Sequence, residues 1–92
     1  MEPVELRFTR FKRFVAQNAS GASMLALFMN MPLGPFLQTV HAKSQEGMSV
    51  EDITSKVLDY AGMRRESFAP ETIEKFQLYI EYFTEVSRQL YQ

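Results

Sequence analysis

The chain has no cysteine and no tryptophan, and its 92 residues include a single histidine, His41. Without cysteine, disulfides, thiol catalysis and thiolate metal sites are excluded, and an intracellular location, cytoplasmic or nuclear, is favoured. A serine–histidine–carboxylate mechanism would depend on His41, and no segment has the pattern of a nucleophile elbow or an oxyanion loop. We therefore expect a protein that is not an enzyme.

Glycine is also scarce, and the four glycines are isolated from one another. A loop that cradles phosphate needs several glycines at close spacing, so no such loop is expected. The acidic residues at 46, 51, 52 and 59 lack the register of a calcium-binding loop. The sequence thus predicts no metal site and no cofactor.

Charged side chains are absent from residues 14–42. Asparagine, serine, glycine, proline and glutamine interrupt this run, so it contains no window of about twenty apolar residues. At the start of the chain, acids precede the bases and no apolar segment follows, unlike a secretory signal. We expect neither a membrane-spanning segment nor a signal peptide.

The charges that are present are unevenly distributed, although the net charge is only −1. Up to Gln45 the acids are Glu2 and Glu5, against five bases, whereas the rest of the chain has nine acids and five bases. With 46% hydrophobic and 23% charged residues, the composition is that of a globular protein. Its length suits a single domain over residues 1–92.

Apolar residues recur at three-to-four spacing through most of the chain, which is typical of amphipathic helices. A strand over 5–11 is a weaker alternative, because its apolar residues do not alternate cleanly. The caps and stops predict helices over about 4–18, from Ser20 or Ser23 to Met31, from Pro35 to a stop at Gly47, from a cap at Ser49 to a stop at Gly62, and from about 70 to 91. The predicted fold is all-α, with four to five helices in a small orthogonal or bundle-like domain and a long C-terminal helix.

The same spacing predicts which side chains face the core. The inward residues expected in the first, fourth and last helices are Leu6, Phe11, Phe14 and Val15; Val50, Ile53, Val57, Leu58 and Tyr60; and Ile73, Phe76, Tyr79, Ile80, Phe83, Val86, Leu90 and Tyr91. Thr84 is expected on the opposite, polar face of the last helix.

Methionine and phenylalanine are concentrated in the uncharged run "MLALFMNMPLGPFL" at 24–37. Methionine fills irregular cores and also lines adaptable grooves that accept a partner helix, so both interpretations stay open. The apolar content exceeds what one small core needs, which favours an interface. We expect a protein–protein interaction module, an adaptor or regulatory subunit, with a partner groove formed by Phe28, Met29, Met31, Leu33 and Phe36.

The long last helix carries a broad apolar stripe that shorter helices would not cover fully. This predicts a homodimer or another oligomer, with self-association through Leu78, Tyr79, Tyr82, Phe83, Val86 and Leu90.

Nucleic-acid binding is the alternative function. In "RFTRFKRF" at 7–14, bases alternate with aromatic residues, a combination that can grip single strands. The contacts would come from Arg7, Arg10, Lys12 and Arg13.

Two further motifs fit a known function less well. His41 with Lys43 and Ser44 loosely resembles the phosphate-accepting helix of histidine phosphotransfer bundles, but the lysine spacing differs. Residues 46–63 have the look of a helix-turn-helix entry. The following helix, however, would present Glu71 and Glu74 to DNA phosphates, which would repel them.

Overall fold

The computed structural model describes residues 2–19 and 23–92, and over these ranges the chain forms five α-helices and one 3-10 turn. The elements are α1 (Val4–Asn18), α2 (Ser23–Met29), α3 (Leu33–Gln45), α4 (Val50–Tyr60), η1 (Arg65–Ser67) and α5 (Pro70–Leu90). The all-α prediction and the long C-terminal helix are therefore confirmed. Ser20, one of the two residues predicted to begin the second helix, lies outside the described residues.

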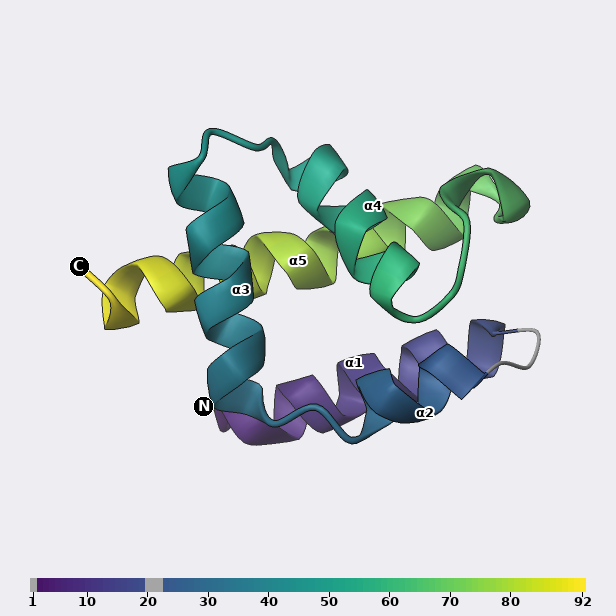
Figure 1. Cartoon of the computed structure of the whole chain (residues 1–92), viewed down its shortest axis with the longest axis horizontal. Coiled ribbons are helices and arrows are strands. Elements are labelled where there is room, and N and C mark those ends of the chain that lie inside the picture. The colour runs from purple at the N-terminus through teal and green to yellow at the C-terminus, as the bar shows by residue number, and fades with distance from the viewer. Residues whose placement is uncertain (1, 20–22) are drawn as a thin grey trace.

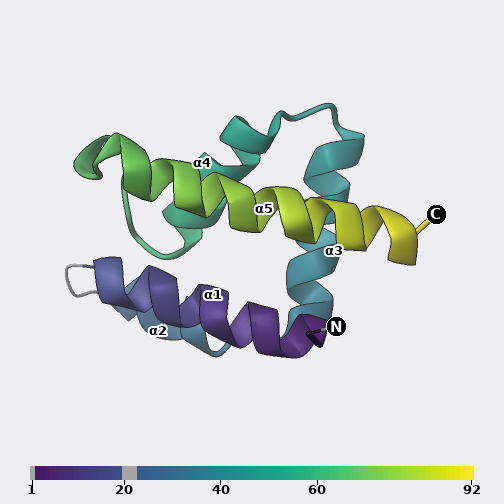
Figure 2. The same ribbon diagram turned by 180° about the vertical axis from the view of Figure 1, so that it is seen from behind.

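The helices form two layers (Figure 1). The long α5 and α1 run side by side in one layer, which faces the viewer in Figure 2. In the other layer α3 crosses α5 at a steep angle, α4 packs on the N-terminal half of α5, and α2 folds back along α1 (Figure 1). The C-terminal helix is thus the central element, contacted by α3 and α4 along one side.

Helix boundaries follow local capping chemistry. Gly47 and Gly62 have φ of 88° and 74°, which favours glycine because it has no Cβ. After Gly47, the Met48 amide donates to the Lys43 carbonyl at 3.2 Å, so this carbonyl in the last turn of α3 has a hydrogen-bond partner. At the start of α4, Ser49 Oγ accepts a hydrogen bond from the Asp52 amide at 3.1 Å, as expected for an N-cap.

The junction between α2 and α3 differs from the prediction. Helix α2 ends at Met29, two residues earlier than expected, and α3 begins at Leu33, two residues earlier than Pro35. Pro35 is the third residue of α3, where the backbone amide has no partner within the helix, so proline is tolerated there. The N-cap is Pro32, in an extended conformation.

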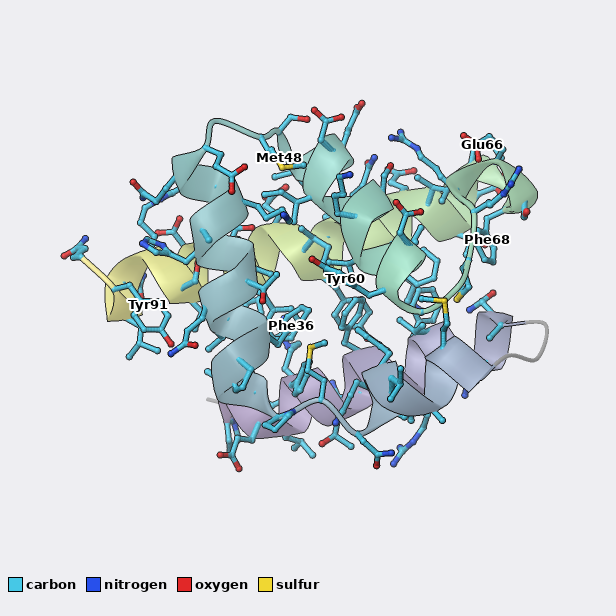
Figure 3. All side chains as sticks on the ribbon, viewed as in Figure 1. Phe36, Met48, Tyr60, Glu66, Phe68 and Tyr91 are labelled. Carbon is cyan, nitrogen blue, oxygen red and sulfur yellow. The ribbon has the colours of Figure 1, made fainter. Side chains whose placement is uncertain are left out.

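Phenylalanine rings fill the core. The buried set is Phe8, Phe11, Phe28, Phe36, Phe76 and Phe83, drawn from α1, α2, α3 and α5. Phe36 lies at the centre of the molecule (Figure 3), stacked on Phe8 at 4.8 Å between centroids and edge-on to Phe83 at 5.3 Å. Edge-to-face and offset pairs of this kind add about 0.5–1.5 kcal/mol each beyond area burial.

Four predictions of side-chain direction are wrong. Leu6, Tyr60 and Leu90 are exposed rather than buried. Leu6 lies only about 20° around the helix from the exposed Arg13, which explains its position. Thr84 is buried, as is Ser87, in the segment between the contacts of α3 with Phe83 and Tyr91. Thr84 Oγ1 donates to the Ile80 carbonyl at 2.7 Å and Ser87 Oγ to the Thr84 carbonyl at 2.8 Å, so these small side chains are satisfied where they are enclosed.

Candidate interaction surface on helices α1 and α5

The predicted partner groove on the uncharged run is not an open surface. Phe28 and Phe36 are 1% and 2% exposed and belong to the core, while Met29, Met31 and Leu33 are half-buried. Phe28 and Phe36 both pack against Phe11 of α1, and Phe36 also packs against Phe83 of α5, so these two rings are unavailable to a partner helix.

The set predicted for self-association is also divided. Phe83 is fully buried, and Tyr79, Tyr82 and Val86 are half-buried. Leu78 and Leu90 are 62% and 61% exposed, but they lie about 120° apart around α5. The residues between the two exposed leucines are buried or half-buried, so the six residues do not form one continuous exposed apolar surface.

The four bases of α1 have separate roles. Lys12 Nζ donates to the carbonyls of Met29 at 3.1 Å and Met31 at 3.3 Å, so it caps the end of α2. Arg7 and Arg10 both form ion pairs with Glu2. Among the described residues, no ion pair or hydrogen bond involves the side chain of Arg13, which is exposed.

The structure brings members of two predicted sets together. Arg7 and Arg10 from α1, with Lys75, Leu78 and Tyr79 from α5, line a hollow of about 230 Å³, here called the α1–α5 groove. Arg7 and Arg10 come from the predicted nucleic-acid contacts, and Leu78 and Tyr79 from the predicted self-association set. The result is an exposed leucine beside three cationic side chains.

Aromatic spacers account for the groove. Helices α1 and α5 run antiparallel (Figure 2). Residues with increasing numbers in α1 therefore contact residues with decreasing numbers in α5: Phe8 contacts Phe83, Phe11 contacts Tyr79, and Phe14 contacts Phe76. Close backbone approach of α5 is made to α3 and α4 instead. Because whole rings lie between α1 and α5, their outer side chains leave space between them.

Two reciprocal cation–π contacts position the cations. The Arg7 guanidinium lies 4.2 Å from the ring centroid of Tyr82, and Lys75 Nζ lies 4.8 Å from that of Phe14. Each contact joins the two helices, in opposite directions. At exposed sites such contacts contribute about 0.5–1 kcal/mol, enough to restrict where these long side chains rest.

The charge of the groove differs from that of the whole chain. Three cations line it, and Glu2 pairs with two of them, Arg7 and Arg10, although the protein has a net charge of −1. The groove is therefore a local positive patch with an apolar centre.

Sequence reasoning missed Lys75 and Glu2. Lys75 carries a readable signal, because it lies three residues before Leu78 and seven before Tyr82, on one face of α5. Glu2 carries none, since its partners are identified only when its side chain is placed.

Other features do not assemble a site. The hollow between α4 and the start of α5 has mixed charge, with Glu51, Glu66 and Glu74 beside Arg65. The His41 ring packs against Tyr91 at 5.3 Å, near the C-terminal end of α5 (Figure 3). Over residues 2–19 and 23–92, no three metal-binding side chains gather. None of the described helices combines the length and hydropathy that crossing a bilayer requires.

Comparison with protein-family models, with curated proteins and with solved structures finds no match to this chain. The function proposed for the groove therefore depends on its own geometry and charge.

Proposed function

We propose that this protein is a non-enzymatic protein–protein interaction module, an adaptor or regulatory subunit, and that it binds its partner through the α1–α5 groove. The observation that carries the proposal is Leu78, an apolar side chain 62% exposed among Arg7, Arg10 and Lys75. Interface centres combine an apolar anchor with positioned polar groups, and arginine and tyrosine are enriched there.

The partner we propose is a different protein rather than a second copy. Glu74, Glu81 and Glu85 are exposed on α5 within about 60° of Leu78 around the helix, on the side away from Lys75 and the groove. Two copies joined face to face at Leu78 with their α5 helices antiparallel would bring these carboxylates together, and like charges in contact are unfavourable. The predicted homodimer also has less support because the residues between the exposed Leu78 and Leu90 are buried or half-buried.

Photo-crosslinking tests the proposal with a matched control. A photoreactive amino acid is incorporated at position 78, and separately at position 90, in the cells that express the protein. The two leucines are equally exposed on the same helix, but only Leu78 lines the groove. We expect a discrete heteromeric adduct from position 78 and not from position 90. The adduct should disappear when Lys75→Glu reverses a groove charge. Equal adducts from both positions, or no adduct at 78, would refute this function.

Nucleic-acid binding by α1 has less support from the geometry. Lys12 is engaged with the end of α2, and Arg7 and Arg10 line the groove beside α5, so Arg13 is the one predicted contact outside these arrangements. In an anisotropy titration with single- and double-stranded oligonucleotides, we expect no saturable binding at physiological salt. Binding whose log–log salt slope has a magnitude of about three to four would instead favour the nucleic-acid function.

A further inference from the structure

The Glu2 carboxylate pairs with both arginines that line the groove. Arg7 Nε donates to Glu2 Oε1 at 2.9 Å, and Arg10 Nη2 pairs with Glu2 Oε2. Each carboxylate oxygen thus has a guanidinium partner, from arginines nearly one turn apart on α1. The Glu2 side chain is 21% exposed, less than either arginine at 38% and 56%.

This arrangement is a preformed carboxylate site. Arg7 is held between the Glu2 carboxylate and the Tyr82 ring, so its guanidinium is oriented by two contacts. Guanidinium groups bind carboxylates by short, charge-assisted hydrogen bonds with defined geometry. A carboxylate from another chain that replaced Glu2 would find Arg7 still held against the Tyr82 ring, with Arg10 beside it on α1.

Lys75 provides a second anion position farther along the groove. In the antiparallel register Arg7 is level with Tyr82, and Lys75 is level with Phe14. The seven residues between 75 and 82 correspond to about 10 Å along α5, and exposed Leu78 lies between these levels. The groove therefore fits a segment with two acidic side chains about two helical turns apart and an apolar side chain between them.

We infer that the partner segment is an acidic amphipathic helix, and that Glu2 competes with it within the molecule for the two arginines. This inference rests on the proposed function and names the partner chemistry of the same groove. A carboxylate of the incoming helix takes the place of Glu2 on Arg7 and Arg10, its second acid pairs with Lys75, and its apolar side chain packs on Leu78.

The competition has a measurable consequence. The two pairs that Glu2 makes are partly exposed, so each contributes only modestly and the expected change in affinity is small. Removing the carboxylate with Glu2→Gln should tighten partner binding about two- to tenfold. Glu5→Gln is the matched control, because it removes the same charge from α1 at an exposed residue that forms no ion pair within the described chain. It should leave the affinity within about twofold, since exposed charges at a distance are screened by salt.

The probe is a fluorescein-labelled, capped synthetic helix of about 18 residues in an alanine–glutamine host, with two glutamates seven residues apart and two leucines between them. Its control replaces both glutamates with glutamine. Binding to the full chain is followed by fluorescence anisotropy. We expect saturable binding of the acidic probe and at least tenfold weaker binding of the glutamine probe. Arg10→Gln should weaken binding about tenfold, whereas Arg13→Gln, one turn away and outside the groove, should not.

The outcomes separate the inference from the proposed function. Binding that needs Arg10 and Lys75 but is unchanged by Glu2→Gln overturns the competition and leaves the groove as the docking surface. If both probes bind equally well, the acidic partner is overturned. The same holds if neither probe binds to the protein or to its Glu2→Gln variant. In either case the crosslink at position 78 still tests the groove as a docking surface. If the affinity for the acidic probe is unchanged by Lys75→Glu, the groove is not the docking surface.

Discussion

Phe36 provides the sharpest test of whether the uncharged run at 24–37 builds the core or a partner surface. Its ring is 2% exposed and lies near Phe8, Phe11, Phe28 and Phe83, at centroid distances of 4.8 to 6.5 Å. These neighbours come from α1, α2 and α5, so one ring on α3 joins three other helices. Its removal should weaken the whole fold.

The size of the effect follows from burial. Replacing a buried phenylalanine by alanine costs about 3–5 kcal/mol, from the lost transfer free energy and the cavity left behind. Loss of the stacked and edge-on ring pairs places Phe36→Ala toward the upper end of that range. A domain of this size has a total stability of about 5–14 kcal/mol, so Phe36→Ala removes a large share of it.

The assay is urea unfolding followed by far-UV circular dichroism. Leu27→Ala is the control, since Leu27 belongs to the same run but is 72% exposed, and it should change the unfolding free energy by less than about 0.5 kcal/mol. If Phe36→Ala is too unstable to purify, Phe36→Leu should still cost about 1–2 kcal/mol and lower the urea midpoint at an unchanged slope. Equal stabilities of the Phe36 and Leu27 variants would refute the core assignment.

Three further predictions address the capping groups and the oligomeric state. Lys12→Met should lower the unfolding free energy by about 1 kcal/mol, because it removes charge-assisted bonds to the carbonyls of Met29 and Met31 at the end of α2. Its control, Arg13→Met, should change the unfolding free energy by less than about 0.5 kcal/mol. Similar urea midpoints for the two variants would contradict the capping role. Gly47→Ala should lower the stability measured by thermal unfolding by about 1 kcal/mol, because φ at this position is 88°. Gly34→Ala should be neutral or stabilising, because Gly34 lies in the first turn of α3 and nothing lies within 4 Å of the added Cβ. A Gly47→Ala variant that is more stable than Gly34→Ala would contradict this backbone analysis. Light scattering over a dilution series should give the mass of one chain throughout, because the exposed leucines of α5 do not form one stripe; a concentration-dependent dimer would restore the self-association surface.

Local features of the chain could be predicted because they depend on a few neighbouring residues. Gly47 and Gly62 end helices through a backbone conformation that glycine adopts readily, and the Ser49 hydroxyl caps a helix through an amide three residues away. The apolar period of α5 likewise reports its buried face at Ile73 and Ile80. The helix count and the all-α class followed from such signals.

Which helix faces meet was decided only in the tertiary structure. The sequence pattern predicts Thr84 as a polar surface residue, yet it is buried in the segment between the contacts of α3 with Phe83 and Tyr91. Phe28 and Phe36 lie in a run whose composition is typical of a docking groove. In the folded chain they fill a core together with residues of α1 and α5, which are distant from them in the sequence.

The candidate site shows the same division. The sequence by itself identified Arg7, Arg10 and Leu78 as exposed or interacting residues, but assigned them to two unrelated functions. Their meeting in one groove depends on the antiparallel register of α1 and α5, which aromatic contacts between residues more than sixty positions apart establish. Periodicity and capping describe each helix about its own axis and contain no information on the register between two helices, so the partnership of Glu2, Arg7, Arg10 and Lys75 around Leu78 came from the folded chain alone.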